Sequence, residues 1–133
     1  SDPSLIPNAV EELLRYEAPS PVNGRWVLKD VELHGTKIPA GSKVLLLTGS
    51  AGRDADVFSD ADAFDIHRDI KKHVTFGYGI HFCLGASLAR TEGRIAIEET
   101  LKRLPNWEIV DGKTVRQHTS TVRGYSEVGI RVS

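Results

Sequence analysis

The sequence has little of several features that would point to a particular class of protein. Its 133 residues contain one cysteine, which excludes an internal disulfide and favours a reducing compartment, so we expect a cytoplasmic protein. The longest purely apolar run, Val44 to Leu47, is far too short to cross a membrane, and no signal peptide is expected. A formal net charge of −1 gives no reason to expect nucleic acid or an anionic membrane as a partner.

Methionine is absent altogether, and the chain opens at Ser1 on the approach to an expected helix. These two features indicate a piece of a longer protein, with removal of an initiator methionine as the alternative. The remaining composition, 40% hydrophobic and 26% charged, is typical of a folded globular protein. We therefore expect one folded unit without an internal domain boundary.

Two helices are predicted from apolar residues that recur at helical spacing, one at residues 7–16 and one at residues 84–104. Pro7 suits the first turn of the first helix, and the proline-containing residues 18–21 end it. Two charge pairs at four-residue spacing would support the second helix, Glu98 with Lys102 and Glu99 with Arg103.

The rest of the chain has the signals of strands and loops. Between residues 22 and 48, short β-branched runs alternate with turn signals, which predicts strands and hairpins. Residues 49–75 have no sustained period and are expected to be irregular, with one short helical turn. Three closing strands are predicted, at residues 106–110, 118–122 and 128–132. The predicted fold class of the chain as given is α+β.

The only cysteine lies in an unusual setting, the stretch FGYGIHFCLG at residues 76–85. Its glycines let the backbone turn tightly. Cys83 stands at the start of the second predicted helix, where the helix dipole would stabilise a thiolate. A lone cysteine without such a context is more often a small buried hydrophobe, but a thiolate in a tight loop is a nucleophile or a metal ligand.

Several chemistries could use that thiolate. A nucleophile would need His81 or His73 as its base, and the sequence spacing does not ensure that contact. A zinc site would need further soft ligands, and there is no second cysteine. A nucleotide-binding loop would need a third glycine, or a following Gly-Lys-Ser/Thr, and both are missing. A single axial thiolate on a heme iron fits these residues best.

The stretch resembles the heme-binding signature of the cytochrome P-450 family in Phe76, Gly77, Gly79, His81, Cys83 and Gly85. Glu12 and Arg15 in EELLR resemble the family's Glu-x-x-Arg pair, and GRD and FDIHR resemble its meander before the heme loop. The resemblance covers essentially the whole chain and is to the soluble bacterial members. The chain departs from the family pattern in the meander, where asparagine and prolines are replaced by Gly52, Ala55 and Ala61.

The resemblance implies that the chain is the carboxy-terminal, heme-binding part of a larger single-domain protein with the mainly-α cytochrome P-450 fold. In this part the family has two main helices, small β-sheets, a long meander and the cysteine-ligand loop. The family's long central helix, with its acid and alcohol pair over the heme, would lie before Ser1. The implied cofactor is heme b.

The resemblance also assigns roles to single residues. Cys83 would be the axial ligand of the iron and the catalytic centre, and Phe76 would pack beside its sulfur. Arg25 and His81 would bind the heme propionates. The implied cofactor-binding set is Arg25, Phe76, Gly77, His81, Cys83, Leu84 and Gly85.

A structural role is implied for the pair formed by Glu12 and Arg15. The two residues would be buried together and hold the meander, with Arg53 or Arg68 as a third member. His73 is expected to be an ordinary loop residue.

The implied activity is that of a heme-thiolate monooxygenase, which inserts one oxygen atom of O2 into a small organic substrate. Its partners would be a ferredoxin-type electron-donor protein and the reductase of that protein. Two alternatives remain: a heme carrier or sensor without oxygenase activity, and a cysteine-dependent hydrolase or transferase. The isolated chain is expected to lack turnover and to self-associate through exposed apolar faces.

Overall fold

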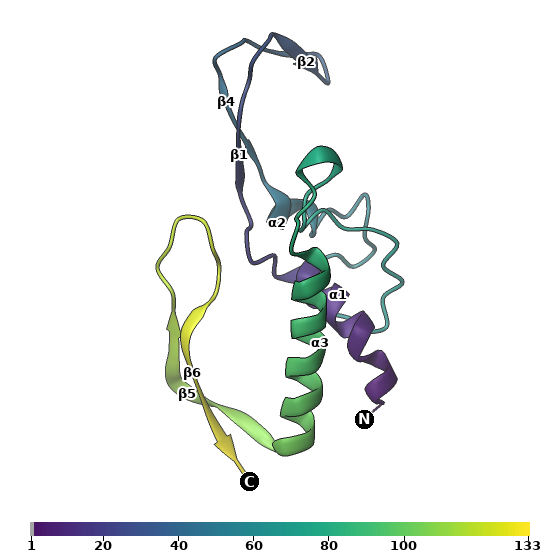
Figure 1. The fold of residues 1–133 in the computed structure, drawn as a ribbon, viewed down its shortest axis with the longest axis vertical. Helices are drawn as coiled ribbons and strands as arrows, with labels where there is room; N and C mark the ends of the chain where they lie inside the picture. The colour runs from purple at the N-terminus through teal and green to yellow at the C-terminus, as the bar shows by residue number, and fades with distance from the viewer. Residues whose placement is uncertain (1) are drawn as a thin grey trace.

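The structure is a computed structural model that describes residues 2–133. Helix α3 (Ala86–Arg103) runs through the centre of the molecule, and helix α1 (Ile6–Tyr16) lies beside it (Figure 1). A narrow β-ribbon formed by residues 23–46 extends beyond one end of α3, and a second hairpin, formed by residues 107–132, lies alongside α3. Among the residues described, no helix combines the length and apolar character needed to span a membrane.

Helix α1 confirms the first predicted helix and begins one residue earlier, at Ile6. A 3-10 turn, η1 (Pro3–Leu5), leads into it. Pro7 occupies the first turn, where its missing N–H has no helical partner to lose. Val10 is buried against Gly93 of α3, where an added Cβ would stand 3.3 Å from the Val10 Cγ1. The two helices therefore approach each other closely.

Residues 22–48 form two antiparallel pairs, which confirms the predicted strand and hairpin region. The pairs are β1 (Asn23–Trp26) with β4 (Lys43–Leu46), and β2 (Val31–Leu33) with β3 (Thr36–Ile38). The turn between β2 and β3 consists of His34 and Gly35, with φ values of 49° and 77°. Positive φ at both positions is what a tight two-residue hairpin turn requires.

A short helix, α2 (Thr48–Ala51), follows β4, and the chain is then irregular until the 3-10 turn η2 (Gly79–His81). This agrees with the predicted irregular segment and its single short helical turn. The segment folds back over α1, where the Asn8 side-chain amide donates to the carbonyl oxygen of Ile66 at 2.6 Å. Hydrogen bonds to α1 therefore help to hold this segment in place, although it forms no regular helix or strand.

Helix α3 confirms the second predicted helix, but it begins two residues later because Gly85 takes the capping position. The predicted charge pair of Glu99 with Arg103 is present at 2.9 Å. The other predicted pair is wrong, because Glu98 bonds Arg94 one turn earlier, at 3.0 Å. A single guanidinium nitrogen of Arg94, Nη1, donates to both carboxylate oxygens of Glu98, at 3.0 Å and 3.2 Å.

The chain closes with a hairpin of two long strands, β5 (Trp107–Arg116) and β6 (Tyr125–Val132). These strands contain most of the first and third closing strands predicted from the sequence. The strand predicted at residues 118–122 is wrong, because these residues form the hairpin loop. There the Thr119 hydroxyl accepts from the Val122 N–H at 2.9 Å and donates to the Val122 carbonyl oxygen at 2.7 Å. A local side-chain bond thus replaces a strand partner.

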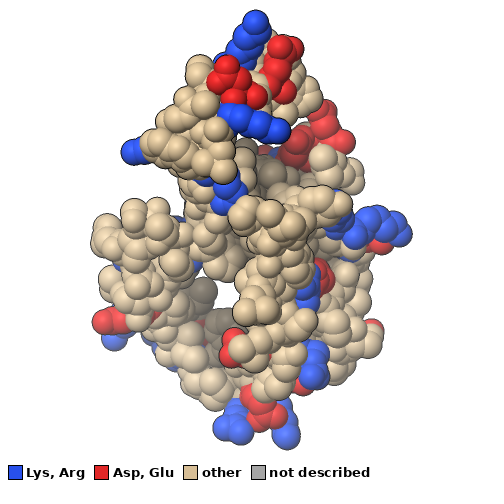
Figure 2. All heavy atoms as spheres, turned by 45° about the horizontal axis from the view of Figure 1, so that its top comes forward, with Lys and Arg blue, Asp and Glu red and all other residues tan. Residues whose placement is uncertain are grey.

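The buried core is small and lies mainly between α1 and the irregular segment. Its apolar members are Ile6, Val10, Ala18, Phe58, Ala61 and Ala86. Uncharged residues cover most of the centre of the face seen in Figure 2, and charged side chains gather toward its rim and at the tip of the β2–β3 hairpin. Two main helices, small two-stranded sheets and a long irregular segment confirm the predicted fold class.

Candidate functional site

The loop before α3 holds the cysteine in a defined position. Gly77 and Gly79 adopt φ values of 74° and 64°, a region that strains residues with a side chain. A Cβ at Gly77 would also stand 3.1 Å from the carbonyl oxygen of His81. The loop closes where the Cys83 N–H donates to the Phe76 carbonyl oxygen at 2.8 Å. The tight turn therefore brings Phe76 and Cys83 together.

Cys83 lies on the wall of a pocket of about 750 Å³, and its thiol is free and exposed. Other residues implicated by the sequence line the same pocket: Arg25, Phe76, Gly77 and His81. Because Arg25 comes from β1 and His81 from η2, the fold brings separate segments around the thiol. Leu84 and Gly85 do not line this pocket, and the Leu84 side chain is fully exposed.

The pocket combines nitrogen-bearing side chains with an apolar wall. Arg25 is half-buried and donates to the Gly24 carbonyl oxygen at 2.8 Å, and no carboxylate of residues 2–133 forms a salt bridge with it. His81 is exposed at the end of η2. Leu46 and Leu47 contribute apolar surface to the same pocket. A flat apolar group that carries carboxylates would match this combination.

The described residues do not supply a histidine bonded to the Cys83 thiol. The Nε2 atom of His73 lies 3.0 Å from Glu11 Oε2, outside the cysteine pocket. His81 lines the pocket but makes no hydrogen bond within residues 2–133. The same residues contain no cluster of three or more His, Cys, Asp or Glu side chains that could hold a metal ion. The geometry thus gives no support to a base-activated nucleophile or to a zinc cluster.

Glu12 and Arg15 form an ion pair on α1 whose side chains are both 0% exposed. Arg15 Nε donates to Glu12 Oε2 at 2.7 Å, and Arg15 Nη1 reaches the carbonyl oxygens of Gly52 at 2.6 Å and Ala61 at 2.8 Å. Burial tends to raise the pKa of Glu12, but hydrogen bonds from Arg15 and the Asp65 amide outweigh it and hold that pKa below its usual value. The charged pair therefore fastens the irregular segment to α1.

Arg68, not Arg53, is the third charged member of this network. Arg68 Nε lies 3.3 Å from Glu12 Oε1, and Arg68 Nη2 donates to the Ala63 carbonyl oxygen at 3.1 Å. Arg53 binds the end of α1 instead. Its Nε donates to the Tyr16 carbonyl oxygen at 2.9 Å, and its guanidinium carbon lies 3.5 Å from the centroid of the Tyr16 ring.

Gly52, where the chain departs from the family pattern, lies at the contact between α1 and the irregular segment. A Cβ at this position would stand 2.2 Å from the Arg15 carbonyl oxygen, which is closer than side chains can approach. A side chain at this position would therefore force the backbone of Arg15 or of Gly52 to shift.

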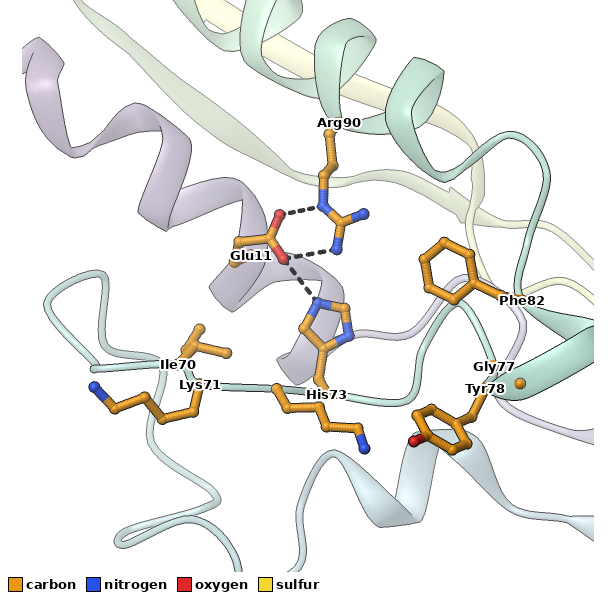
Figure 3. A pocket seen from close by; sticks show the side chains of 10 residues that line it. Glu11, Ile70, Lys71, His73, Gly77, Tyr78, Phe82 and Arg90 are labelled. Atoms are coloured by element: carbon orange, nitrogen blue, oxygen red, sulfur yellow. Dashed lines mark hydrogen bonds and ion pairs between the residues drawn. The ribbon is translucent and has the colours of Figure 1, made fainter.

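A second cluster, which the sequence did not predict, lies beside the cysteine loop (Figure 3). Glu11 accepts hydrogen bonds from Arg90 Nε at 2.5 Å, Arg90 Nη2 at 3.0 Å and His73 Nε2 at 3.0 Å. These three residues line a pocket of about 460 Å³ together with Tyr78 and Phe82. The bond from Arg90 lowers the pKa of Glu11 despite its burial, and the pKa of Arg90 is raised by the same bond.

Only a weak signal for this cluster is present in the sequence. His73 does lie in a loop, as expected, but its side chain is only 3% exposed. Arg90 follows Cys83 by about two helical turns, which places it near the loop. Glu11 stands far from both in the chain, so its partners could not be found from spacing.

The comparisons with known proteins agree on one family. The family model described as cytochrome P-450 matches residues 4–125. A curated relative, cytochrome P-450 123 of Mycobacterium tuberculosis, is 49% identical over 99% of this chain and 33% of its own length. The steroid C26-monooxygenase of the same organism is 45% identical over 86% of this chain and 29% of its own length.

Solved structures agree with these relatives. The crystal structure of cytochrome P-450 BioI, in complex with an acyl carrier protein ligated to hexadec-9Z-enoic acid, superposes with a TM-score of 0.94 at 39% identity. The match covers 99% of this chain and 34% of that structure. The chain thus spans about a third of the length of the relatives it matches.

Proposed function

Because this chain belongs to the cytochrome P-450 family, with the family match extending over residues 4–125, we propose that the full-length protein is a heme-thiolate monooxygenase. It inserts one oxygen atom of O2 into an organic substrate. The observation that carries this proposal is the free, exposed thiol of Cys83 in a pocket shared with Arg25 and His81. The chain is the carboxy-terminal, heme-binding part of a larger single-domain protein.

The donor set of the pocket fits a non-covalently bound heme b. A heme iron bound here supplies the oxygen chemistry, and a thiolate ligand favours O–O cleavage. Covalent attachment of the c type uses a C-x-x-C-H sequence, which a chain with one cysteine cannot contain. Arg25 and His81, with no carboxylate partner in residues 2–133, hold the two propionates.

Several residues of the cysteine loop have a defined task in this proposal. The Phe76 carbonyl oxygen accepts from the Cys83 N–H and so holds the backbone of Cys83 in place. With heme bound, the Phe76 ring would pack beside the sulfur and limit its access to water, which would tune the redox potential of the iron. Gly77 allows the backbone to approach the cofactor closely, and Gly85 and Leu84 lead the loop into α3.

We further propose that the electrons for the reaction come from a ferredoxin-type donor protein and its reductase, as the family resemblance implies. A single free thiol is compatible with the reducing conditions of the cytoplasm, where we expect the protein to work. The substrate is a small organic molecule.

The decisive measurement is the absorption spectrum of the reduced, heme-loaded full-length protein with carbon monoxide. Thiolate ligation should give a strongly red-shifted Soret band, and Cys83→Ala should lose it. Persistence of the band in Cys83→Ala would show that another residue binds the iron. A cysteine-dependent hydrolase would instead lose activity to thiol alkylators in the absence of heme. A heme carrier or sensor would show the band without substrate oxidation.

The propionate roles need a separate variant with a matched control. Arg25→Ala should accelerate heme loss, because it removes a charge-assisted bond to a carboxylate. Lys43→Ala removes a positive charge from the adjacent strand β4, outside the pocket lining, and should leave heme retention unchanged. Equal heme loss in the two variants would argue against a specific role for Arg25.

A further inference from the structure

The ring of Phe76 lies close to two side chains that share one carboxylate. The guanidinium carbon of Arg90 is 4.8 Å from the ring centroid, and the His73 ring centroid lies 6.2 Å away at a tilt of 45°. Both side chains bond Glu11 of α1, and Figure 3 shows Arg90 reaching down from α3 while His73 approaches from the loop. One acidic residue thus holds both neighbours of the Phe76 ring.

His73 is fixed by a second bond. The Thr75 N–H donates to His73 Nδ1 at 3.3 Å, so the proton lies on Nε2, which donates to Glu11. The Thr75 hydroxyl donates to the Leu14 carbonyl oxygen of α1 at 2.8 Å. The residues immediately before Phe76 are therefore anchored on α1 through the side chains of His73 and Thr75.

The contacts continue from Phe76 to the backbone of Cys83, since the Phe76 carbonyl oxygen accepts from the Cys83 N–H at 2.8 Å. We propose that Glu11 and Arg90 are positioning residues: Glu11 holds the Arg90 guanidinium against the Phe76 ring, and this contact fixes the loop that presents the Cys83 thiol. The inference rests on the proposed function only for the role of the thiol as an iron ligand.

Helix α3 also provides a matched control pair. Arg94 and Glu98 form a similar ion pair one turn along, with side chains 44% and 40% exposed, against 37% for Arg90 and 28% for Glu11. Arg94 makes no cation–π contact in the described residues, whereas Arg90 does. The two arginines therefore differ mainly in what their guanidinium groups hold.

The first test measures the rate at which iodoacetamide alkylates Cys83 in the full-length protein without heme, followed by mass spectrometry of its peptide. Arg90→Gln should raise this rate about tenfold, because a charged hydrogen bond and a cation–π contact are lost. Arg94→Gln should leave the rate unchanged. An unchanged rate in Arg90→Gln would overturn the proposal.

Two further variants separate positioning from charge and from general loosening. Arg90→Lys keeps the charge but loses the planar fork, so it should behave like Arg90→Gln; protection equal to that of arginine would overturn the proposal. In a Phe76→Leu background, Arg90→Gln should add nothing, because its effect passes through the ring. A full additional effect would overturn the proposal. Circular dichroism checks that each variant is folded. If Arg90→Gln does not fold, Arg90→Lys is measured in its place.

The second readout uses the heme-loaded protein. Arg90→Gln and Glu11→Gln should each lose part of the red-shifted Soret band of the carbon monoxide complex, whereas Arg94→Gln should keep it. If the unmodified protein lacks that band while Arg90→Gln still accelerates alkylation, the proposed function fails and the positioning role stands. If the band is present and neither readout responds to Arg90→Gln, the positioning role fails alone.

Discussion

The region around Glu12 and Arg15 differs from the region around Cys83 in how completely its polar groups are paired within the chain. Around Glu12 and Arg15 each charged side chain has an ion-pair partner, and within residues 2–133 no buried side-chain nitrogen or oxygen atom lacks a hydrogen-bond partner. Around Cys83 the thiol is exposed, and Arg25 has no acidic partner in the described chain. We call the first region closed, because its polar groups are paired within the described chain. We call the second region open, because it leaves the thiol and Arg25 available to another group.

Helix α3 belongs to the open region despite its length. Of its 18 residues only Ala86 is buried, and Leu88 is 62% exposed and Ile95 46% exposed. A helix in a finished domain buries an apolar stripe instead. Variants in the closed region should therefore affect folding, whereas those in the open region should affect ligand binding and association.

The largest effect is expected from a substitution at Glu12 that breaks the ion pairs of the closed region. In the full-length protein, Glu12→Ala leaves the Arg15 guanidinium buried without its partner, which typically destabilises a protein by about 3–5 kcal/mol. We expect little folded, heme-loaded protein, measured by yield and by thermal unfolding. Glu98→Ala breaks an exposed pair and should change stability by only about 0–1 kcal/mol. An unchanged melting temperature in Glu12→Ala would argue that the pair contributes no more than a surface pair.

A second test studies residues 1–133 without the rest of the full-length protein. Purified residues 1–133 should self-associate, because large apolar side chains on α3 and on β5 and β6 are exposed and such patches favour association. Light scattering measures the mass in solution, and titration with hemin measures cofactor binding, which we expect to be weak. A monodisperse monomer that binds hemin stoichiometrically would show that the open region is complete without further protein.

Local patterns in the sequence predicted the local parts of this structure. Pro7 and the apolar spacing predicted α1, and the glycines of the cysteine loop predicted a tight turn. Residues 118–122 were predicted wrongly as a strand, because the β-branched residues Thr119, Thr121 and Val122 are equally compatible with a loop in which the Thr119 side chain bonds the backbone.

Contacts between distant residues could not be predicted in the same way. Arg53 and Arg68 were equal candidates for the Glu12 network, and only the path of the irregular segment brings Arg68 to the carboxylate. The bond between Glu11 and His73 joins residues that no periodicity connects. The resemblance to a family suggested the buried Glu12 pair, but it did not include this second cluster.

The third prediction compares the two candidate arginines. The Arg68 side chain is 9% exposed and bonds Glu12 and several carbonyl oxygens, so Arg68→Ala should destabilise the protein by about 1–3 kcal/mol. Arg53 is 29% exposed and makes no bond to Glu12, so Arg53→Ala should have a smaller effect. Urea unfolding of the two variants in the full-length protein measures the difference. A larger loss in Arg53→Ala would reverse the assignment of the third member.

The smallest expected effect concerns pH and Glu11, which lies between the two regions. The hydrogen bond from Arg90 is the main cause of a Glu11 pKa below its ordinary value of 4.5, and the bond from His73 adds to it against the opposing effect of burial. A carboxyl group with a lowered pKa in the folded state stabilises the fold fully above pH 4.5 and loses that contribution as the pH falls through the folded-state value. In Glu11→Gln the free energy of unfolding should therefore be lower near neutral pH and fall less steeply below pH 4.5. Because the side chain is 28% exposed, solvent screening keeps this effect small.

Urea unfolding at a series of pH values measures the slope, and Glu98→Gln, which removes the same charge from the exposed pair, should retain the slope of the unmodified protein. If Glu11→Gln also retains that slope, Glu11 belongs with the exposed surface pairs and not with the closed network.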